Sequence, residues 1–84
     1  MITVKDASYY QDYKINIEFN HGEYGVIDLE NVLWGPVFEP LKDIELFKKM
    51  KVSDLFHTIV WDSGADIAPE FLYDRLKKRS FNRD

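Results

Sequence analysis

Three carboxylates in one stretch come closest to a ligand-binding pattern. Asp62, Asp66 and Glu70 follow one another at intervals of four residues between Thr58 and Tyr73, around a glycine turn. Carboxylate oxygens gathered at a turn can bind a divalent cation or another cationic group. The spacing does not match an EF-hand loop, which needs oxygen ligands at alternate positions and a central glycine, and a helix N-terminus prefers anions. We therefore expect no metal and no cofactor.

The same stretch also has a structural explanation. Pro69 suits the first residue of a helix, because its missing N–H would have no partner there. Glu70 then lies in the first turn, where its charge favours the helix dipole. Asp66 can accept backbone N–H bonds near that end. We favour this interpretation: a strand, a glycine turn, an acidic cap and a packed helix.

The sequence contains no clear pattern for nucleophilic catalysis. Ser63, His57 and Asp62 have the side-chain types of a Ser-His-Asp triad, but the nucleophile-elbow pattern is absent. His57 and His21 are the only histidines, and we expect both to serve local structure. The chain has no cysteine, which excludes disulfides, a thiolate nucleophile and cysteine-ligated zinc or iron–sulfur sites. We expect that the protein is not an enzyme.

Charge is divided unequally along the chain. Residues 1–74 carry six Lys and Arg against fourteen Asp and Glu, a net charge of −8, whereas residues 75–84 carry five against one, a net charge of +4. The acidic body argues against a broad phosphate-binding face, so only the basic end could contact nucleic acid or an acidic partner. Cations near a helix C-terminus also stabilise the helix dipole, and we favour this role. Four of these cations are Arg75, Lys77, Lys78 and Arg79.

Three large aromatic residues, Trp34, Phe38 and Trp61, have placements that matter for function. Most of the aromatic side chains are expected in the core. If Trp34 and Phe38 lie on the surface beside Gly35-Pro36, they form an apolar patch of the kind that marks an interface. A small sheet also leaves edge strands that can pair between chains. Homodimerisation is therefore a hypothesis.

The first third of the chain has the periodicity of β-structure. Residues 2–5 alternate as a short strand, which Asp6-Ala7-Ser8 is expected to end. Apolar and polar residues alternate strictly over Tyr13–Phe19, which predicts a strand with one buried face. His21-Gly22 predicts a two-residue hairpin turn, since glycine accepts a positive φ. The return strand is predicted from Glu23 to about Asp28.

The middle of the chain changes to helical spacing. Asp28 is placed to cap a short helical turn that reaches Trp34. Pro36 and Pro40 stand on either side of Phe38 and Glu39, so residues 37–41 predict an irregular apolar connection. Asp43 is placed to cap a second short helix that ends near Lys49.

The last part of the chain returns to strands before a final helix. Residues 50–52 predict one strand, and the continuous apolar run Thr58–Trp61 predicts a central strand covered on both faces. The pattern from Pro69 to about Arg79 is helical. This order predicts an α+β domain over residues 1–79 with a mainly antiparallel sheet of about five strands, short helices and a C-terminal helix, followed by a frayed basic tail at 80–84.

Two longer motifs carry a family resemblance, together with Gly22, Asp28-Leu29, Phe47 and the run Thr58–Trp61. These motifs are Gly35-Pro36-Val37-Phe38-Glu39-Pro40-Leu41 and Gly64-Ala65-Asp66-Ile67-Ala68-Pro69-Glu70-Phe71-Leu72-Tyr73. With them the chain resembles, over about residues 1–74, the bacterial domain-of-unknown-function family numbered 2442. The resemblance implies a small α+β fold and no established activity, cofactor or catalytic residue. Similar members often lie beside another small protein in what look like toxin–antitoxin pairs, and longer members carry an additional helix-turn-helix domain.

The chain is short and has no long apolar segment. A chain of 84 residues buries only about 60–65% of its unfolded surface. No run reaches the roughly 18–20 apolar residues of a membrane span, and the N-terminus lacks the pattern of a signal peptide, so we expect a soluble cytoplasmic protein.

The expected function is a binding or regulatory module that acts through protein–protein contact, as an antitoxin-like partner of a neighbouring small protein. The alternative is a nucleic-acid-associated regulator that uses the basic tail, and a small enzyme ranks third. The expected interaction residues are Trp34, Phe38, Trp61, Asp62, Asp66, Glu70, Arg75, Lys77, Lys78 and Arg79.

Overall fold

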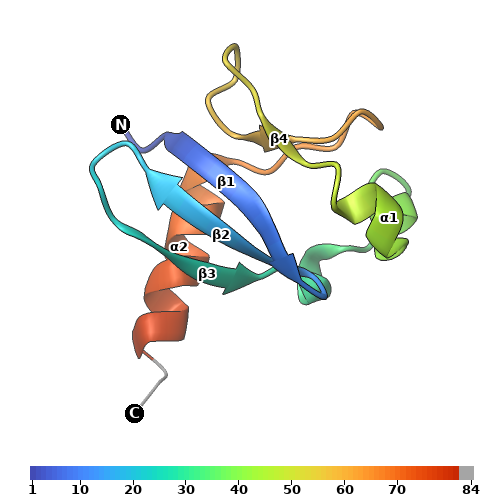
Figure 1. The fold of residues 1–84 in the computed structure, drawn as a ribbon, viewed down its shortest axis with the longest axis horizontal. Helices are drawn as coiled ribbons and strands as arrows, with labels where there is room; N and C mark the ends of the chain where they lie inside the picture. Colours follow the sequence, from blue (N-terminus) through green and yellow to red (C-terminus); the bar gives the residue numbers. More distant parts are fainter. Residues whose placement is uncertain (82–84) are drawn as a thin grey trace.

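A three-stranded antiparallel sheet with the C-terminal helix across one face forms the larger part of the fold (Figure 1). The computed structural model describes residues 1–81, with side chains through Lys78. The strands, in the spatial order β1-β2-β3, are β1 (Val4–Gln11), β2 (Lys14–Phe19) and β3 (Tyr24–Asp28), and the helix is α2 (Pro69–Phe81).

The predicted alternation of β2 is confirmed and explains why α2 packs where it does. Ile15, Ile17 and Phe19 are buried, and Leu72 and Leu76 of α2 are buried in the same core.

The packing of α2 against β3 depends on a glycine. A Cβ atom added at Gly25 would lie 2.7 Å from Cδ1 of Leu76. Since heavy atoms in contact lie at about 3.5–4.0 Å, glycine allows the close approach of the helix to the sheet.

The expected end of the first strand at Asp6-Ala7-Ser8 is wrong. β1 continues to Gln11, and its pairing with β2 shifts register between Val4 and Asp6 and again between Tyr9 and Gln11. These irregularities let polar residues take solvent-facing positions while the backbone pairing continues. The polar residues Asp6 and Ser8 lie on the exposed face of β1. They do not end the strand, because its backbone hydrogen bonds do not depend on the side chains.

The β2–β3 turn is longer than the expected two residues, because three residues, 20–22, lie between the hydrogen-bonded residues Phe19 and Glu23. The Gly22 N–H donates to the Phe19 carbonyl (2.9 Å), and the Phe19 N–H donates to the Glu23 carbonyl (2.9 Å). Gly22 has φ +99°, so the expected role of this glycine is confirmed.

Two short 3-10 helices occupy the connection after β3. The first, η1 (Glu30–Val32), follows Asp28, whose Oδ1 accepts a hydrogen bond from the Glu30 N–H (2.9 Å). The expected helical turn is present, but its N-cap residue is Leu29 rather than Asp28, and it ends at Val32, before Trp34. The second, η2 (Glu39–Lys42), lies where an irregular connection was expected. Pro40 explains the difference, because proline fits the first turn of a helix, where its missing N–H costs nothing.

The next helix, α1 (Ile44–Phe47), has the predicted cap. The Asp43 carboxylate accepts a hydrogen bond from the Glu45 N–H (3.0 Å). The helix ends at Phe47, slightly before the expected end at Lys49.

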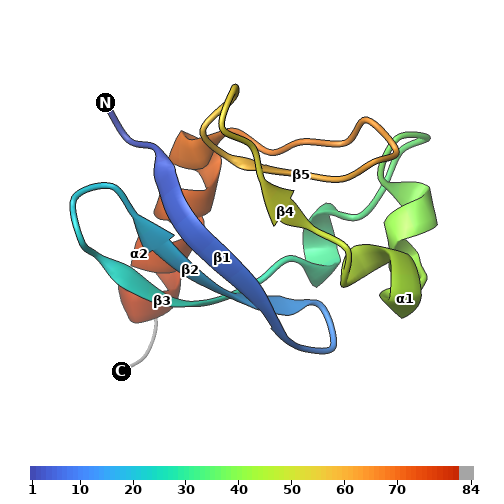
Figure 2. The ribbon, with the colours of Figure 1, turned by 45° about the horizontal axis from the view of Figure 1, so that its top comes forward.

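A second, two-stranded antiparallel sheet lies beside the first and contains β4 (Lys51–Val52) and β5 (Ile59–Val60) (Figure 2). Five antiparallel strands with short helices and a C-terminal helix confirm the α+β class. The prediction that Thr58–Trp61 forms a central strand is wrong, because β5 belongs to the two-stranded sheet and not to the middle of the larger one. Its predicted burial is correct, since Thr58, Ile59 and Trp61 are buried. A continuous apolar run indicates burial on both sides and does not specify how many strands pair with it.

The start of α2 at Pro69 is confirmed, and the helix continues to Phe81, past the expected end at Arg79. The remainder of the expected tail, residues 82–84, lies outside the described residues. Within the described chain, no helix combines the length and apolar character needed to cross a membrane.

Candidate functional site

The three carboxylates of the opening pattern have separate surroundings. Asp62 forms an ion pair with Lys51, with Oδ1 2.8 Å from Nζ. The hydrogen bond from Lys51, with its positive charge, lowers the pKa of Asp62 below the ordinary value. Glu70 is exposed in the first turn of α2. Among the described residues, no group of three or more His, Asp or Glu side chains is placed to hold a metal ion.

Asp66 is held by its backbone, through an antiparallel bridge to Val60. Its side chain is exposed and accepts no hydrogen bond from the described residues. The expected capping role is therefore wrong. The bridge to β5 holds Asp66 ahead of the helix, and the first turn is closed by N–H groups of Phe71 and Leu72 that donate to the Ala68 carbonyl (3.1 and 3.2 Å).

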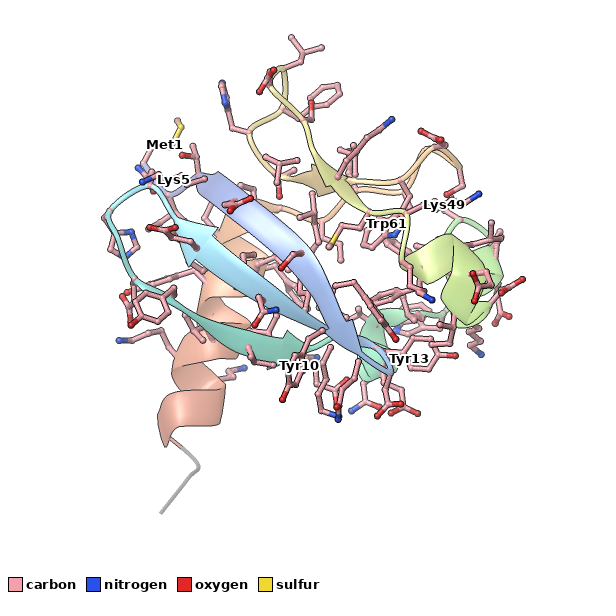
Figure 3. All side chains as sticks on the ribbon, in the orientation of Figure 1. Met1, Lys5, Tyr10, Tyr13, Lys49 and Trp61 are labelled. Carbon is pink, nitrogen blue, oxygen red and sulfur yellow. The ribbon has the colours of Figure 1, made fainter. Side chains whose placement is uncertain are left out.

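The turn before Asp66 is anchored in the core by Trp61. The Trp61 N–H donates to the Ala65 carbonyl and the Gly64 N–H donates to the Trp61 carbonyl, both at 3.0 Å, and Gly64 has φ +96°. Trp61 is only 4% exposed, and its Nε1–H donates to the Phe47 carbonyl (3.0 Å). Figure 3 labels Trp61 near α1. Trp61 was expected as an interaction residue, but its indole is buried in the core and is not available to a partner.

Trp34 meets the condition of the patch hypothesis, and Phe38 meets it in part. Trp34 is 72% exposed, and Phe38 is half-buried against the core. Both line a groove of about 510 Å³ between the η1–η2 connection and the start of α2. The full lining is Val32, Trp34, Phe38, Asp66, Ile67, Ala68 and Phe71. We call this the Trp34 groove.

A second hollow of about 330 Å³ adjoins the first, and Asp66 lines both. We call it the Phe56 hollow, because Phe56 on its wall is 59% exposed. Its lining is Lys51, Ser53, Phe56, Val60, Trp61, Asp62, Gly64, Ala65 and Asp66. Sequence reasoning did not identify Phe56 as a surface residue.

The loop that carries Phe56 is tightly held. The Ser53 Oγ accepts hydrogen bonds from the N–H groups of Leu55 (3.1 Å) and Phe56 (3.0 Å), and the His57 N–H donates to the Ser53 carbonyl (2.8 Å). His57 has φ +58°. Ser53 was the available signal, because serine hydroxyls commonly close such turns. His57 and Ser63 lie at opposite ends of β5, and no hydrogen bond joins them.

Glu23 is the centre of a polar cluster that joins the β2–β3 turn to α2. Its Oε1 accepts from the Tyr73 hydroxyl (2.9 Å) and lies 3.1 Å from His21 Nε2, while Oε2 accepts from Lys77 Nζ (3.0 Å). The hydrogen bonds from His21, Lys77 and Tyr73 lower the pKa of Glu23 to about 2. Glu23 in turn raises the pKa values of Tyr73 and Lys77. Lys77 is therefore committed to an internal contact.

The other cations of α2 face solvent to different degrees. Lys78 forms an ion pair with Asp74 (3.3 Å). The Arg75 guanidinium lies 5.5 Å from the centre of the Phe71 ring. The side chain of Arg79 lies outside the described part of the structure.

Comparisons with known proteins show a similar fold and a family. The comparison with curated proteins finds no match. The crystal structure of the "Putative DNA Binding Protein NE0471" from Nitrosomonas europaea ATCC 19718 superposes with a TM-score of 0.83 over 96% of this chain, at 17% sequence identity. At that identity the likeness concerns the fold alone, and the chain spans 52% of that protein's length. The model of a family described as protein of unknown function (DUF2442) matches residues 4–78, which confirms the resemblance: the chain belongs to this family.

Proposed function

We propose that this chain is a regulatory domain associated with nucleic acid, and that it contacts phosphates through the basic C-terminal part of α2. The supporting observation is the likeness to about half of a protein described as DNA-binding, at a TM-score of 0.83. The charge distribution limits the contact to that end of the helix, because residues 1–74 have a net charge of −8 and repel phosphate.

The ion pairs of α2 indicate which cations can take part. The pair between Lys78 and Asp74 is exposed, and such pairs contribute little, so a phosphate can replace Asp74 as the partner of Lys78. Lys77 is less available, because it is shared between the Glu23 carboxylate and the Tyr73 ring. Contacts of this kind bind phosphate without reading the base sequence.

Fluorescence anisotropy with a labelled DNA duplex and a labelled single-stranded RNA tests this proposal. With five cations in residues 75–84, the affinity should fall by up to roughly 10²–10³-fold between about 50 and 200 mM salt. Lys78→Ala should reduce the slope of log K against log salt by about one unit. Lys42→Ala is the matched control, since Lys42 pairs with Glu39 at the same 3.3 Å on another part of the surface. No binding of either nucleic acid at low salt, or equal effects of the two variants, would refute the proposal.

A second function, protein–protein contact as an antitoxin-like partner of a neighbouring small protein, is favoured by a different observation. The Trp34 groove and the Phe56 hollow leave two aromatic side chains exposed on an acidic body, which complements a basic partner. Purification of the native protein from its own cell should recover a stoichiometric protein partner. Recovery of nucleic acid without a protein would favour the first function instead.

A further inference from the structure

We propose that the Trp34 groove and the Phe56 hollow together bind one segment of a partner protein, in which apolar residues flank a Lys or Arg. The inference rests on the protein-contact function and specifies the chemistry of the partner. Because Asp66 lines both hollows, a single segment that occupies both must pass over its carboxylate.

The apolar part of the site consists of exposed aromatic side chains. Trp34 is 72%, Phe56 59% and Phe71 43% exposed. Large aromatic residues supply most of the binding energy at protein interfaces when they become fully covered. The two hollows, of about 510 and 330 Å³, also fall within the roughly 300–1,000 Å³ typical of ligand pockets. The surface therefore fits apolar side chains at two points.

The charged part of the site is Asp66. Its backbone is fixed by the bridge to Val60, and its carboxylate has no ion-pair partner among the described residues. Lys51, a cation that also lines the Phe56 hollow, is already held by Asp62 at 2.8 Å. A purely apolar segment would cover the Asp66 carboxylate without compensation, which is costly, whereas a Lys or Arg in the segment supplies the missing partner.

The walls of the site need little ordering before they bind. Phe56 stands on the loop between β4 and β5, which projects from the body of the molecule (Figure 1). Three hydrogen bonds to Ser53 hold this loop. A preformed wall loses less conformational entropy on binding than a flexible one, so more of the contact energy remains as affinity.

Selection of phage-displayed random peptides on the whole chain tests the inference. The enriched peptides should carry a Lys or Arg flanked by apolar residues. Trp34→Ala and Phe56→Ala should each weaken a recovered peptide by about tenfold or more. In a repeated selection, Asp66→Lys should shift the preference at the central position from basic to acidic residues.

Two neighbouring residues provide matched controls. Leu55 and Asp54 are exposed on the same loop as Phe56 but line neither hollow. Leu55→Ala and Asp54→Asn should leave peptide affinity unchanged, and circular dichroism should show that all the variants fold.

The contrary outcomes separate this inference from the function on which it rests. Enriched peptides without a basic residue, or an unchanged preference on Asp66→Lys, would overturn the inference, and so would a selection that enriches nothing. A protein partner recovered from the native cell would still support protein contact in each of these cases. If the chain sediments as a dimer that Trp34→Ala converts to a monomer, the occupant is a second copy and the inference is also overturned.

Discussion

Two turns of this molecule share one backbone design and differ in what they do. The turns Phe19–Glu23 and Trp61–Ala65 each begin with a buried aromatic residue and place a glycine at positive φ in the fourth position. Both are closed by the same two hydrogen bonds, from the glycine N–H to the first carbonyl and from the first N–H to the last carbonyl. Local sequence therefore produces the same turn in two sheets of different size.

The carboxylates beside these turns have different surroundings. Glu23 ends the first turn and receives Tyr73, Lys77 and His21, which tie the turn to α2. Asp66 directly follows the second turn, and its side chain has no partner among the described residues. A carboxylate therefore has a structural role, or stays free to bind a partner, according to the hydrogen-bond donors that the fold brings to it. The sequence alone does not distinguish the two cases.

The largest expected effect concerns the aromatic residues that begin the turns. Phe19→Ala and Trp61→Ala should each lower the free energy of unfolding by about 3–5 kcal/mol, because each removes a buried ring from the core. Trp34→Ala, at the exposed tryptophan, should change it by no more than about 0.5 kcal/mol. Urea denaturation followed by circular dichroism measures all three. If Trp61→Ala costs no more than Trp34→Ala, the assignment of Trp61 to the core is wrong.

The next effect concerns the glycines of the two turns. Gly22→Ala and Gly64→Ala should each destabilise the protein by about 1–2 kcal/mol, because alanine disfavours a positive φ. The two values should agree, since no atom lies within 4 Å of an added Cβ at either position. Gly25→Ala is the contrast, because there the obstacle is Leu76 of α2 and not the backbone angle. Clearly unequal values for Gly22 and Gly64 in the same denaturation experiment would show that the turns are not equivalent.

Much of the fold could be predicted from local patterns. The alternation in Tyr13–Phe19, the Asp43 cap and the start of α2 at Pro69 all depend on residues close in sequence. The position of Thr58–Trp61 could not, because the folded chain decides that this strand pairs with β4 and Asp66 and stays outside the three-stranded sheet. The strand at Asp6–Ser8 was missed since its irregular register hides the alternation.

The candidate site was predictable only in part. The sequence suggested Trp34 and Phe38 as a patch only on the condition that both lie on the surface, and their exposure could not be predicted from residue types. The contribution of Phe56 required knowledge of the loop that Ser53 closes, and the availability of Asp66 required the bridge to Val60. Ser53 was a local signal for the loop, but the partners that distinguish Asp62, Asp66 and Glu70 are set by the folded chain, so the residue types alone made these three carboxylates appear equivalent.

The smallest expected effect separates Glu23 from Asp66 by pH. The pKa of Glu23 is about 2 in the folded chain, below its ordinary value of 4.5. A carboxylate with a lowered folded pKa binds protons less readily than in the unfolded chain, so its stabilisation is fully present above about pH 4.5 and is lost as the pH falls towards 2. Glu23→Gln should therefore lower Tm at pH 7 and should show a smaller further loss of Tm between pH 4.5 and 2 than the wild type.

Asp66→Asn is the matched control for this experiment, because it removes the same charge beside an equivalent turn. Its Tm at pH 7 should match that of the wild type, since no described residue donates a hydrogen bond to the Asp66 carboxylate. Thermal unfolding followed by circular dichroism at low salt measures both variants. Parallel profiles for Glu23→Gln and the wild type would mean that the cluster with Tyr73 and Lys77 does not hold α2 to the turn. A loss of Tm in Asp66→Asn at pH 7 would show instead that Asp66 has a structural partner, and would remove it from the proposed binding site.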